Sequence, residues 1–171
     1  MTEELKIDGK TKEEVFAEVE SYLSSFIRIR YKDSSRPWGG FFTIDETDTD
    51  TFIRKYYPFL SRTDLSISGR LSPKILLVEP GKKLSWQYHH RRAEIWKVIA
   101  GKTIVVTSDT DKENEEKVLE CGDIIELKQG ERHRLIGMEK WGVIAEIWRH
   151  TDPAHPSDED DIVRIQDDFG R

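Results

Sequence analysis

Side chains that can hold a divalent metal ion stand close together between Gly81 and Gly101. Gln87 and His89 are two residues apart, so on an extended strand both side chains leave the same face. Glu94 follows after four residues that are able to form a turn, and it opens a second apolar run. The two glycines bracket the unit as turn residues. The pattern predicts a hairpin that brings Gln87, His89 and Glu94 to one point.

A second stretch supplies a further candidate ligand, His133. Residues 122–133 predict a strand, a turn at Gln129 and Gly130, and another strand that starts near His133. Together the two hairpins offer two imidazoles, one carboxylate and one amide oxygen, with no thiolate. Such donors suit zinc, manganese, iron, cobalt or nickel. We therefore expect one divalent metal ion as cofactor, with zinc favoured among these metals.

These residues resemble the two sequence motifs of the cupin superfamily. The first motif is matched without a gap by Gly81, Gln87, His89, Glu94 and Gly101. Glutamine at the first ligand position is the phosphomannose isomerase version of this motif. The second motif is matched by Gly122, Gly130 and His133. Lys128 stands where proline is usual and Gly137 where asparagine is usual, which affects the stiffness of the turn more than metal ligation.

The resemblance is narrower than the superfamily and points to the isomerase domain of type II mannose-6-phosphate isomerases. It runs from about Arg36 to Arg171, through R-P-W-G at 36–39, Q-x-H-H-x-R-A-E-x-W at 87–96, G-x-x-H-R-L at 130–135, E-D-D-I-V-R at 159–164 and D-F-G-R at 168–171. Arg91 and Ile95 replace residues that are commonly histidine in that family. In bifunctional members this domain follows a mannose-1-phosphate guanylyltransferase, and we expect no such domain in 171 residues.

The resemblance implies a metal-dependent aldose–ketose isomerase that interconverts mannose 6-phosphate and fructose 6-phosphate through an enediol. It implies that Gln87, His89, Glu94 and His133 hold the metal, which polarises substrate oxygens as a Lewis acid. Arg92 belongs to the family's catalytic motif and would stabilise an oxyanion or grip the phosphate.

Other residues are candidates for roles around this centre. Glu146 and Lys97 are candidates for the base that the reaction needs. The candidates for binding the substrate phosphate are Arg36, Lys74, Arg134 and Arg164. Trp38 and Arg36 are expected at the mouth of the pocket.

Two other classes of function stay open. One is a non-catalytic cupin that binds a sugar phosphate or a nucleotide sugar, and turnover of mannose 6-phosphate separates it from the isomerase. The other is a different metal-dependent cupin enzyme, such as an oxygenase, which oxygen uptake identifies. An oxygenase usually prefers a histidine-rich set to glutamine at the first ligand position.

Composition limits the partners of this protein. The 27 basic and 33 acidic residues give a net charge of −6, which disfavours nucleic acid as the main partner. No apolar run approaches the length of a membrane span, and the charged start of the chain lacks the apolar core of an export signal. A single cysteine rules out an internal disulfide. We expect a soluble, cytoplasmic protein that acts on a small sugar phosphate and, as cupins commonly do, forms a homodimer.

The pattern of apolar residues predicts a mainly β protein, a jelly-roll barrel with an N-terminal helix and helical decoration, and the resemblance implies that this barrel is of the cupin type. Helices are expected over 11–25, where Thr11 and Glu14 form a capping box, and over 47–57. Strands are expected over 41–44, 74–79, 84–89, 94–100, 102–108, 117–119, 123–127, 133–138 and 142–149. We divide the single structural domain into residues 1–70, which decorate the barrel, and residues 71–171, the barrel and its tail.

The end of the chain and the remaining histidines complete the expectations. The acidic run from Asp158 to Asp161 is typical of a solvated surface. The apolar residues after it suggest a tail that docks and helps to close the site. His90 is expected to point away from the ligands, and His150 and His155 are expected at the surface.

Overall fold

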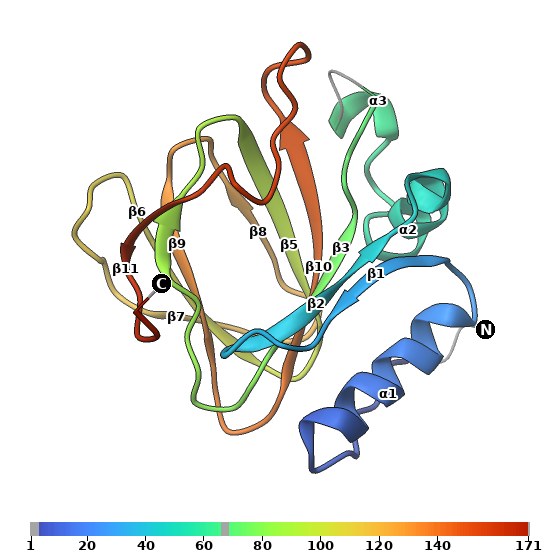
Figure 1. Ribbon diagram of the computed structural model, residues 1–171. Helices are drawn as coiled ribbons and strands as arrows, with labels where there is room; N and C mark the ends of the chain where they lie inside the picture. The colour runs from blue at the N-terminus through green and yellow to red at the C-terminus, as the bar shows by residue number, and fades with distance from the viewer. Residues whose placement is uncertain (1–3, 66–68, 171) are drawn as a thin grey trace.

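The computed structural model describes residues 4–65 and 69–170, and within them the chain is mainly β with a few short helices (Figure 1). Arg171 and the first three residues lie outside the described part. A six-stranded antiparallel sheet runs in the order β1 (Ile29–Asp33), β2 (Gly39–Ile44), β3 (Lys74–Val78), β10 (Gly142–His150), β5 (Arg92–Ala100) and β8 (Ile124–Leu127). A five-stranded antiparallel sheet runs in the order β11 (Val163–Gln166), β4 (Trp86–Tyr88), β9 (Arg132–Gly137), β6 (Thr103–Ser108) and β7 (Lys117–Leu119).

The two sheets face each other and enclose an apolar core, as expected for a barrel with strands of period two. Trp96 and Val98 of β5 point into this core, and so does Leu135 of β9. Ile95 and Ala100 of β5 face the other side of the sheet. The central strands of the larger sheet are therefore buried on both faces, which explains their continuous apolar runs.

The outer face of the larger sheet is covered by helices on one side of the barrel (Figure 1). Helix α1 (Lys12–Ser24) begins at the predicted cap, where the hydroxyl of Thr11 accepts a hydrogen bond of 3.2 Å from the amide of Glu14. Its apolar stripe includes Phe16, which packs on Phe42 of β2. The helix predicted over 47–57 is present as α2 (Thr49–Tyr56), preceded by the short 3₁₀ helix η1 (Glu46–Asp48) and followed by α3 (Arg62–Leu65).

The predicted turns before and after the first hairpin are confirmed. Gly81 and Gly101 have φ angles of +73° and +70°. A β-carbon at Gly101 would lie 2.3 Å from the carbonyl oxygen of Trp141, so that turn requires glycine both for its φ angle and for space.

Three expectations about the elements were wrong or incomplete. Strand β1 was not predicted, because three of its five side chains are exposed and show no alternation. It joins β2 in the same sheet as the barrel strands, so the segment before residue 71 contributes strands as well as helices. His150, expected at the surface, is only 3 % exposed at the end of β10. Its hydrogen bonds to Ser72 and Ser157 explain how a polar ring is accommodated there.

Candidate metal centre and substrate cavity

Three of the four predicted ligands lie together at the open end of the barrel. His89 follows β4, Glu94 lies on β5 and His133 lies on β9, and their ligand atoms all lie within 4.8 Å of one another. The Nε2 atom of His89 is 3.1 Å from one carboxylate oxygen of Glu94, and that of His133 is 3.7 Å from the other. All three side chains are at most 3 % exposed. Two hairpins far apart in sequence thus meet as the spacing predicted.

The protonation of the two imidazoles fits metal binding. The Nδ1 atoms of His89 and His133 lie 2.6 and 3.0 Å from the carbonyl oxygens of Asp161 and Glu131, which accept hydrogen bonds only. Each Nδ1 therefore carries a proton, which leaves Nε2 as the nitrogen of each ring that faces Glu94 and is available to a metal. Nε2 of His133 is buried and has no hydrogen-bond partner among the described residues. Burial lowers the pKa of His133 to about 4, so its ring is neutral at physiological pH. Such donors fit a divalent metal.

Gln87, the fourth predicted ligand, stands directly opposite His133 in the register between β4 and β9. Its side-chain oxygen accepts a hydrogen bond of 2.5 Å from the hydroxyl of Ser85, and both residues line the adjoining cavity. The hydrogen bond from Ser85 fixes the orientation of the amide oxygen of Gln87. Ligation through Gln87 stays a prediction.

Arg92 lies against the cluster. Its Nε atom donates to a carboxylate oxygen of Glu94 at 2.8 Å, and its Nη2 atom lies 3.2 Å from Nε2 of His89. The guanidinium stacks over the ring of Trp148 at 3.7 Å. Burial by itself would raise the pKa of Glu94, but His89 and Arg92 hold it well below its usual range. Glu94 is therefore an anion, as a metal ligand must be.

A second buried carboxyl group, that of Glu146 on β10, lies close to the first. The indole N–H of Trp96 is shared between Glu94 at 2.9 Å and Glu146 at 2.7 Å, and Trp148 donates to the other oxygen of Glu146 at 2.7 Å. Burial, followed by the negative charge of Glu94, raises the pKa of Glu146 to about 8. One carboxyl group is thus held ionised and the other titrates near neutral pH, a division typical of acid–base sites.

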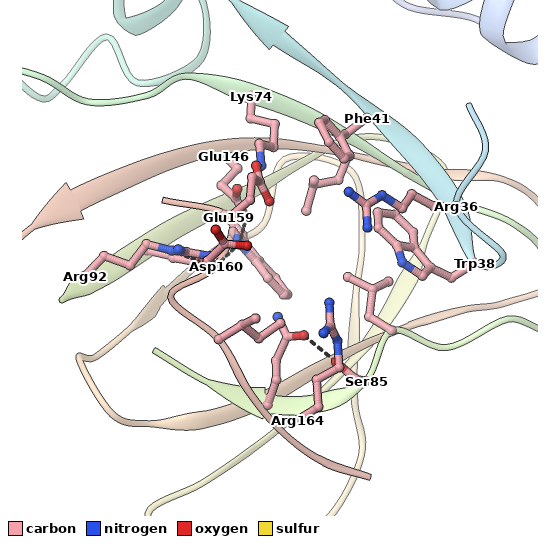
Figure 2. A pocket seen from close by; sticks show the side chains of 16 residues that line it. Arg36, Trp38, Phe41, Lys74, Ser85, Arg92, Glu146, Glu159, Asp160 and Arg164 are labelled. Atoms are coloured by element: carbon pink, nitrogen blue, oxygen red, sulfur yellow. Dashed lines mark hydrogen bonds and ion pairs between the residues drawn. The ribbon is translucent and has the colours of Figure 1, made fainter. Parts of the chain in front are cut away.

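Both carboxyl groups line a cavity of about 360 Å³ that opens beside the candidate metal ligands. Figure 2 shows Arg36, Lys74 and Arg164 around the same space, so three of the four predicted phosphate-binding cations line it. Trp38 also lines it, as expected for the mouth.

Lys74 is the most deeply placed of these three cations. It is 5 % exposed, and its ammonium group lies over the rings of Phe41 and Trp148 at 4.4 and 4.5 Å. It pairs with the carboxylate of Glu159 from the tail. Lys74 therefore offers a fixed positive charge inside the cavity.

Arg134, the fourth predicted phosphate-binding residue, is placed elsewhere. Its guanidinium donates to the carbonyl oxygens of Leu84 and Gln166 at 2.9 and 3.2 Å and to Glu113 at 3.1 Å. His133 faces the interior, so the next residue along the strand must face the opposite side. Arg134 was expected to bind the substrate phosphate. Instead it points away from the cavity and links β9 to the tail by hydrogen bonds.

Lys97, one of the two candidate bases, also points away from the cavity, because neighbouring side chains on a strand face opposite sides of the sheet. It follows the inward-facing Trp96, and its ammonium group donates to the carbonyl oxygen of Tyr56 at 2.9 Å on the helical side of the sheet. Only Glu146 of the two candidates reaches the cavity.

The sequence analysis missed several residues that shape the site. Trp96 and Trp148 lie two residues after Glu94 and Glu146, so period two could have shown that both indoles point inward with the carboxyl groups. Asp161 was expected on a solvated surface, yet it is 4 % exposed and bonds to the backbone beside His89. His155 is exposed, as expected.

Comparisons with known proteins agree with this geometry. Residues 45–167 match the family described as mannose-6-phosphate isomerase C-terminal. The chain belongs to this family. It is 33 % identical over 136 residues to the alginate biosynthesis protein AlgA of Pseudomonas putida, covering 75 % of this chain and 26 % of that protein. It is 31 % identical over 171 residues to the mannose-1-phosphate guanylyltransferase of Escherichia coli, covering 100 % of this chain and 27 % of that protein. The chain spans about a quarter of the length of these relatives.

One solved structure supports the fold. The capsular polysaccharide assembling protein CapF from Staphylococcus aureus aligns with a TM-score of 0.53 at 14 % identity, covering 80 % of this chain and 34 % of that chain. A cupin 2 conserved barrel domain protein from Salinispora arenicola aligns with a TM-score of 0.43 at 21 % identity, over 52 % of this chain and 68 % of that chain. With the two facing sheets and the family match, the predicted cupin-type barrel is confirmed. Over the described residues, none of the helices has the length and apolar character needed to cross a membrane.

Proposed function

We propose that this chain is a metal-dependent isomerase that interconverts mannose 6-phosphate and fructose 6-phosphate. The observation that carries the proposal is the pair of buried carboxyl groups of Glu94 and Glu146 in one cavity. Glu94 is held ionised beside two imidazoles, while the pKa of Glu146 is raised to about 8. An aldose–ketose isomerase needs this combination, because it must bind two oxygens of the substrate and move a proton between neighbouring carbons.

The metal centre would be formed by His89, Glu94 and His133, with Gln87 as the fourth ligand. When bound there, a divalent metal, for which we propose zinc, supplies Lewis-acid polarisation of the substrate oxygens at C1 and C2. Arg92 stands beside the same point, with its guanidinium held by Glu94 and by the hydroxyl of Ser157. Its fixed charge would stabilise the negative charge that develops on those oxygens.

Glu146 would be the base. In its ionised form the carboxylate removes the proton from C2 of the open-chain aldose, which leaves an enediolate that becomes the enediol when O1 is protonated. The same carboxyl group then returns a proton to C1, while the hydroxyl proton of O2 is lost as O2 becomes the carbonyl oxygen and O1 gains one. No atom is gained or lost over the cycle. A base with a pKa near the working pH is suited to both transfers.

The phosphate would lie toward the mouth of the cavity, away from the reacting carbons. Arg36, Lys74 and Arg164 line the cavity, with Arg36 and Arg164 more exposed than Lys74, and guanidinium groups bind phosphate oxygens in pairs. A cavity of about 360 Å³ lies within the range of small-molecule sites. Relatives named for alginate biosynthesis suggest that the product serves polysaccharide synthesis.

The test is a coupled assay. Metal-stripped protein is given zinc, manganese, cobalt or iron singly and mixed with mannose 6-phosphate, and the formation of fructose 6-phosphate is followed. We expect metal-dependent turnover that falls about 10²–10⁴-fold in Glu146→Gln, the usual contribution of acid–base catalysis. Glu126→Gln, a change of an exposed glutamate on β8, is the matched control and should keep full activity. Tight metal binding without product under any condition would favour the non-catalytic sugar-phosphate-binding cupin.

A further inference from the structure

We propose that Asp161, in the tail that follows β10, is a positioning residue for the metal ligand His89. Docking of the tail over residues 157–161 and the affinity of the metal centre are therefore coupled. The inference rests on the proposed metal centre, and it assigns a role to one residue of the acidic run.

The backbone of Asp161 fixes the tautomer of His89. Its carbonyl oxygen lies 2.6 Å from Nδ1 of His89, and a carbonyl oxygen accepts a hydrogen bond but cannot donate one. Nδ1 therefore carries a proton, and Nε2, which lies 3.1 Å from a carboxylate oxygen of Glu94, is the nitrogen that can bind a metal. Without this acceptor, a neutral imidazole can also place its proton on Nε2, and a protonated nitrogen does not bind a metal.

The side chain of Asp161 holds the backbone in the position that makes this contact. Its carboxylate is fully buried and accepts hydrogen bonds from the amides of His90 and Arg91 at 2.9 and 3.0 Å and from the hydroxyl of Ser157 at 2.6 Å. His90 and Arg91 belong to the turn between the two ligands His89 and Glu94. Asp161 in the tail thus binds the turn of the hairpin that carries His89 and Glu94, although it lies 70 residues after Arg91 in the chain.

The same segment of the tail also lines the cavity, through Glu159 and Asp160. Arg92 donates to the hydroxyl of Ser157 at 2.9 Å and to the carbonyl oxygen of Asp158 at 3.0 Å. Beyond Asp161 the chain continues into β11, which pairs with the ligand strand β4 where Arg164 is opposite Gln87. Figure 1 shows the tail crossing the open end of the barrel between β10 and β11. Since docking the tail orders a ligand, binding the metal must by reciprocity stabilise the docked tail.

Two measurements on the full chain test the inference. The first is the affinity for zinc and cobalt alone, measured by competition with a chelator in wild type and in Asp161→Asn. We expect affinity to fall about tenfold or more, as is usual when a residue that orients a ligand is changed. Asp152→Asn is the matched control, because its carboxylate also accepts a backbone amide on the same tail, at Ala154, but lies away from the ligands. It should bind metal as the wild type does.

The second measurement distinguishes positioning from a merely structural role. Nitrogen NMR of the imidazoles in metal-free protein, above the pH range in which they are protonated, reports which nitrogen carries the hydrogen. We expect His89 to be protonated on Nδ1 in the wild type and in Asp152→Asn, and to be a mixture of both tautomers in Asp161→Asn. Hydrogen exchange of the amides of residues 157–161 should slow when zinc is added to the wild type.

Clear results would overturn the inference. Wild-type metal affinity or an unchanged His89 tautomer in Asp161→Asn would do so. If that variant does not fold, Ser157→Ala removes one of the three donors to the same carboxylate. Weaker metal binding and a partial tautomer change in that variant support the inference, whereas wild-type behaviour contradicts it. Failure of the wild type to bind metal would contradict the proposed metal centre instead, and the tautomer measurement, which needs no metal, would still decide the role of Asp161.

Discussion

Trp96 donates its one indole N–H to both buried carboxyl groups of the cavity, to Glu94 at 2.9 Å and to Glu146 at 2.7 Å. The two acids come from neighbouring strands of the same sheet, and Trp96 stands opposite Glu146 in the register. A shared donor holds them at a fixed separation, while burial and then the negative charge of Glu94 raise the pKa of Glu146. Glu94, the candidate metal ligand, and Glu146, the proposed base, are therefore a coupled pair. They are joined by Trp96, whose indole does not itself titrate.

Replacing the shared donor should affect both chemistry and stability. We expect Trp96→Phe to lower the free energy of unfolding by about 1–3 kcal/mol, the cost of leaving buried acceptors without a partner. It should also lower kcat, because Glu94 and Glu146 are no longer held in place. Trp86→Phe is the matched control, since its indole also donates one buried hydrogen bond, to the carbonyl oxygen of Asp111 at 2.7 Å. Denaturation and the coupled assay check both variants, and equal loss of kcat in the two would contradict a specific role for Trp96.

The raised pKa of Glu146 predicts how stability depends on pH. In the unfolded chain this group loses its proton near its ordinary pKa of 4.5, whereas in the folded protein it keeps the proton up to about pH 8. Between these values the folded state binds more protons, so unfolding releases one and stability falls as the pH rises. The slope is at most about 1.4 kcal/mol per pH unit.

Urea denaturation of the metal-free protein at several pH values between these limits measures this slope. Glu146→Gln has no proton to release, so the free energy of unfolding of the wild type should fall relative to that of the variant as the pH rises between these limits. Parallel curves for the two proteins would show that the pKa of Glu146 is not raised by folding.

Local spacing and the motif resemblance together were enough to predict that His89, Glu94 and His133 lie close to one another. Glu94 and His133 stand at motif positions, so each candidate ligand could be located from the residues close to it in sequence. The alternation of side chains along a strand explains the errors. Arg134 follows the inward-facing His133 and must point away, which the sequence analysis could have used and did not.

Contacts between distant segments were not accessible in this way. Asp161 sits in an acidic run whose composition is typical of solvated surface, and only three donors from Ser157 and the ligand turn make its burial favourable. His150 was misplaced for a related reason: its partners, Ser72 and Ser157, come from a loop and from the tail. Neither residue carries a local signal of burial, because part of its hydrogen bonding comes from remote residues: the amides of His90 and Arg91 for Asp161, and the hydroxyl of Ser72 for His150.

The contact between Lys74 and Glu159 predicts competition with the substrate phosphate. Lys74 is buried, whereas the side chain of Glu159 is 53 % exposed and can turn into water at small cost. We expect Glu159→Gln to improve the inhibition constant of inorganic phosphate by up to about fivefold, because a pair with an exposed partner contributes up to about 1 kcal/mol. Asp152→Asn, which removes the same charge from the exposed part of the tail, is the control. Equal effects of both variants would indicate a general change in charge and no specific competition at Lys74.

The corrected position of Arg134 separates two arginines that the sequence had grouped together. Arg36 lines the cavity, so Arg36→Gln should raise KM for the sugar phosphate about tenfold, the effect of losing a hydrogen bond between charged groups. Arg134→Gln should leave KM unchanged and lower the free energy of unfolding by about 1–3 kcal/mol, because Leu84 and Gln166 lose the donor to their carbonyl oxygens. Steady-state kinetics and urea denaturation of both variants give the four values needed. A raised KM with unchanged stability in Arg134→Gln would return this residue to the substrate site.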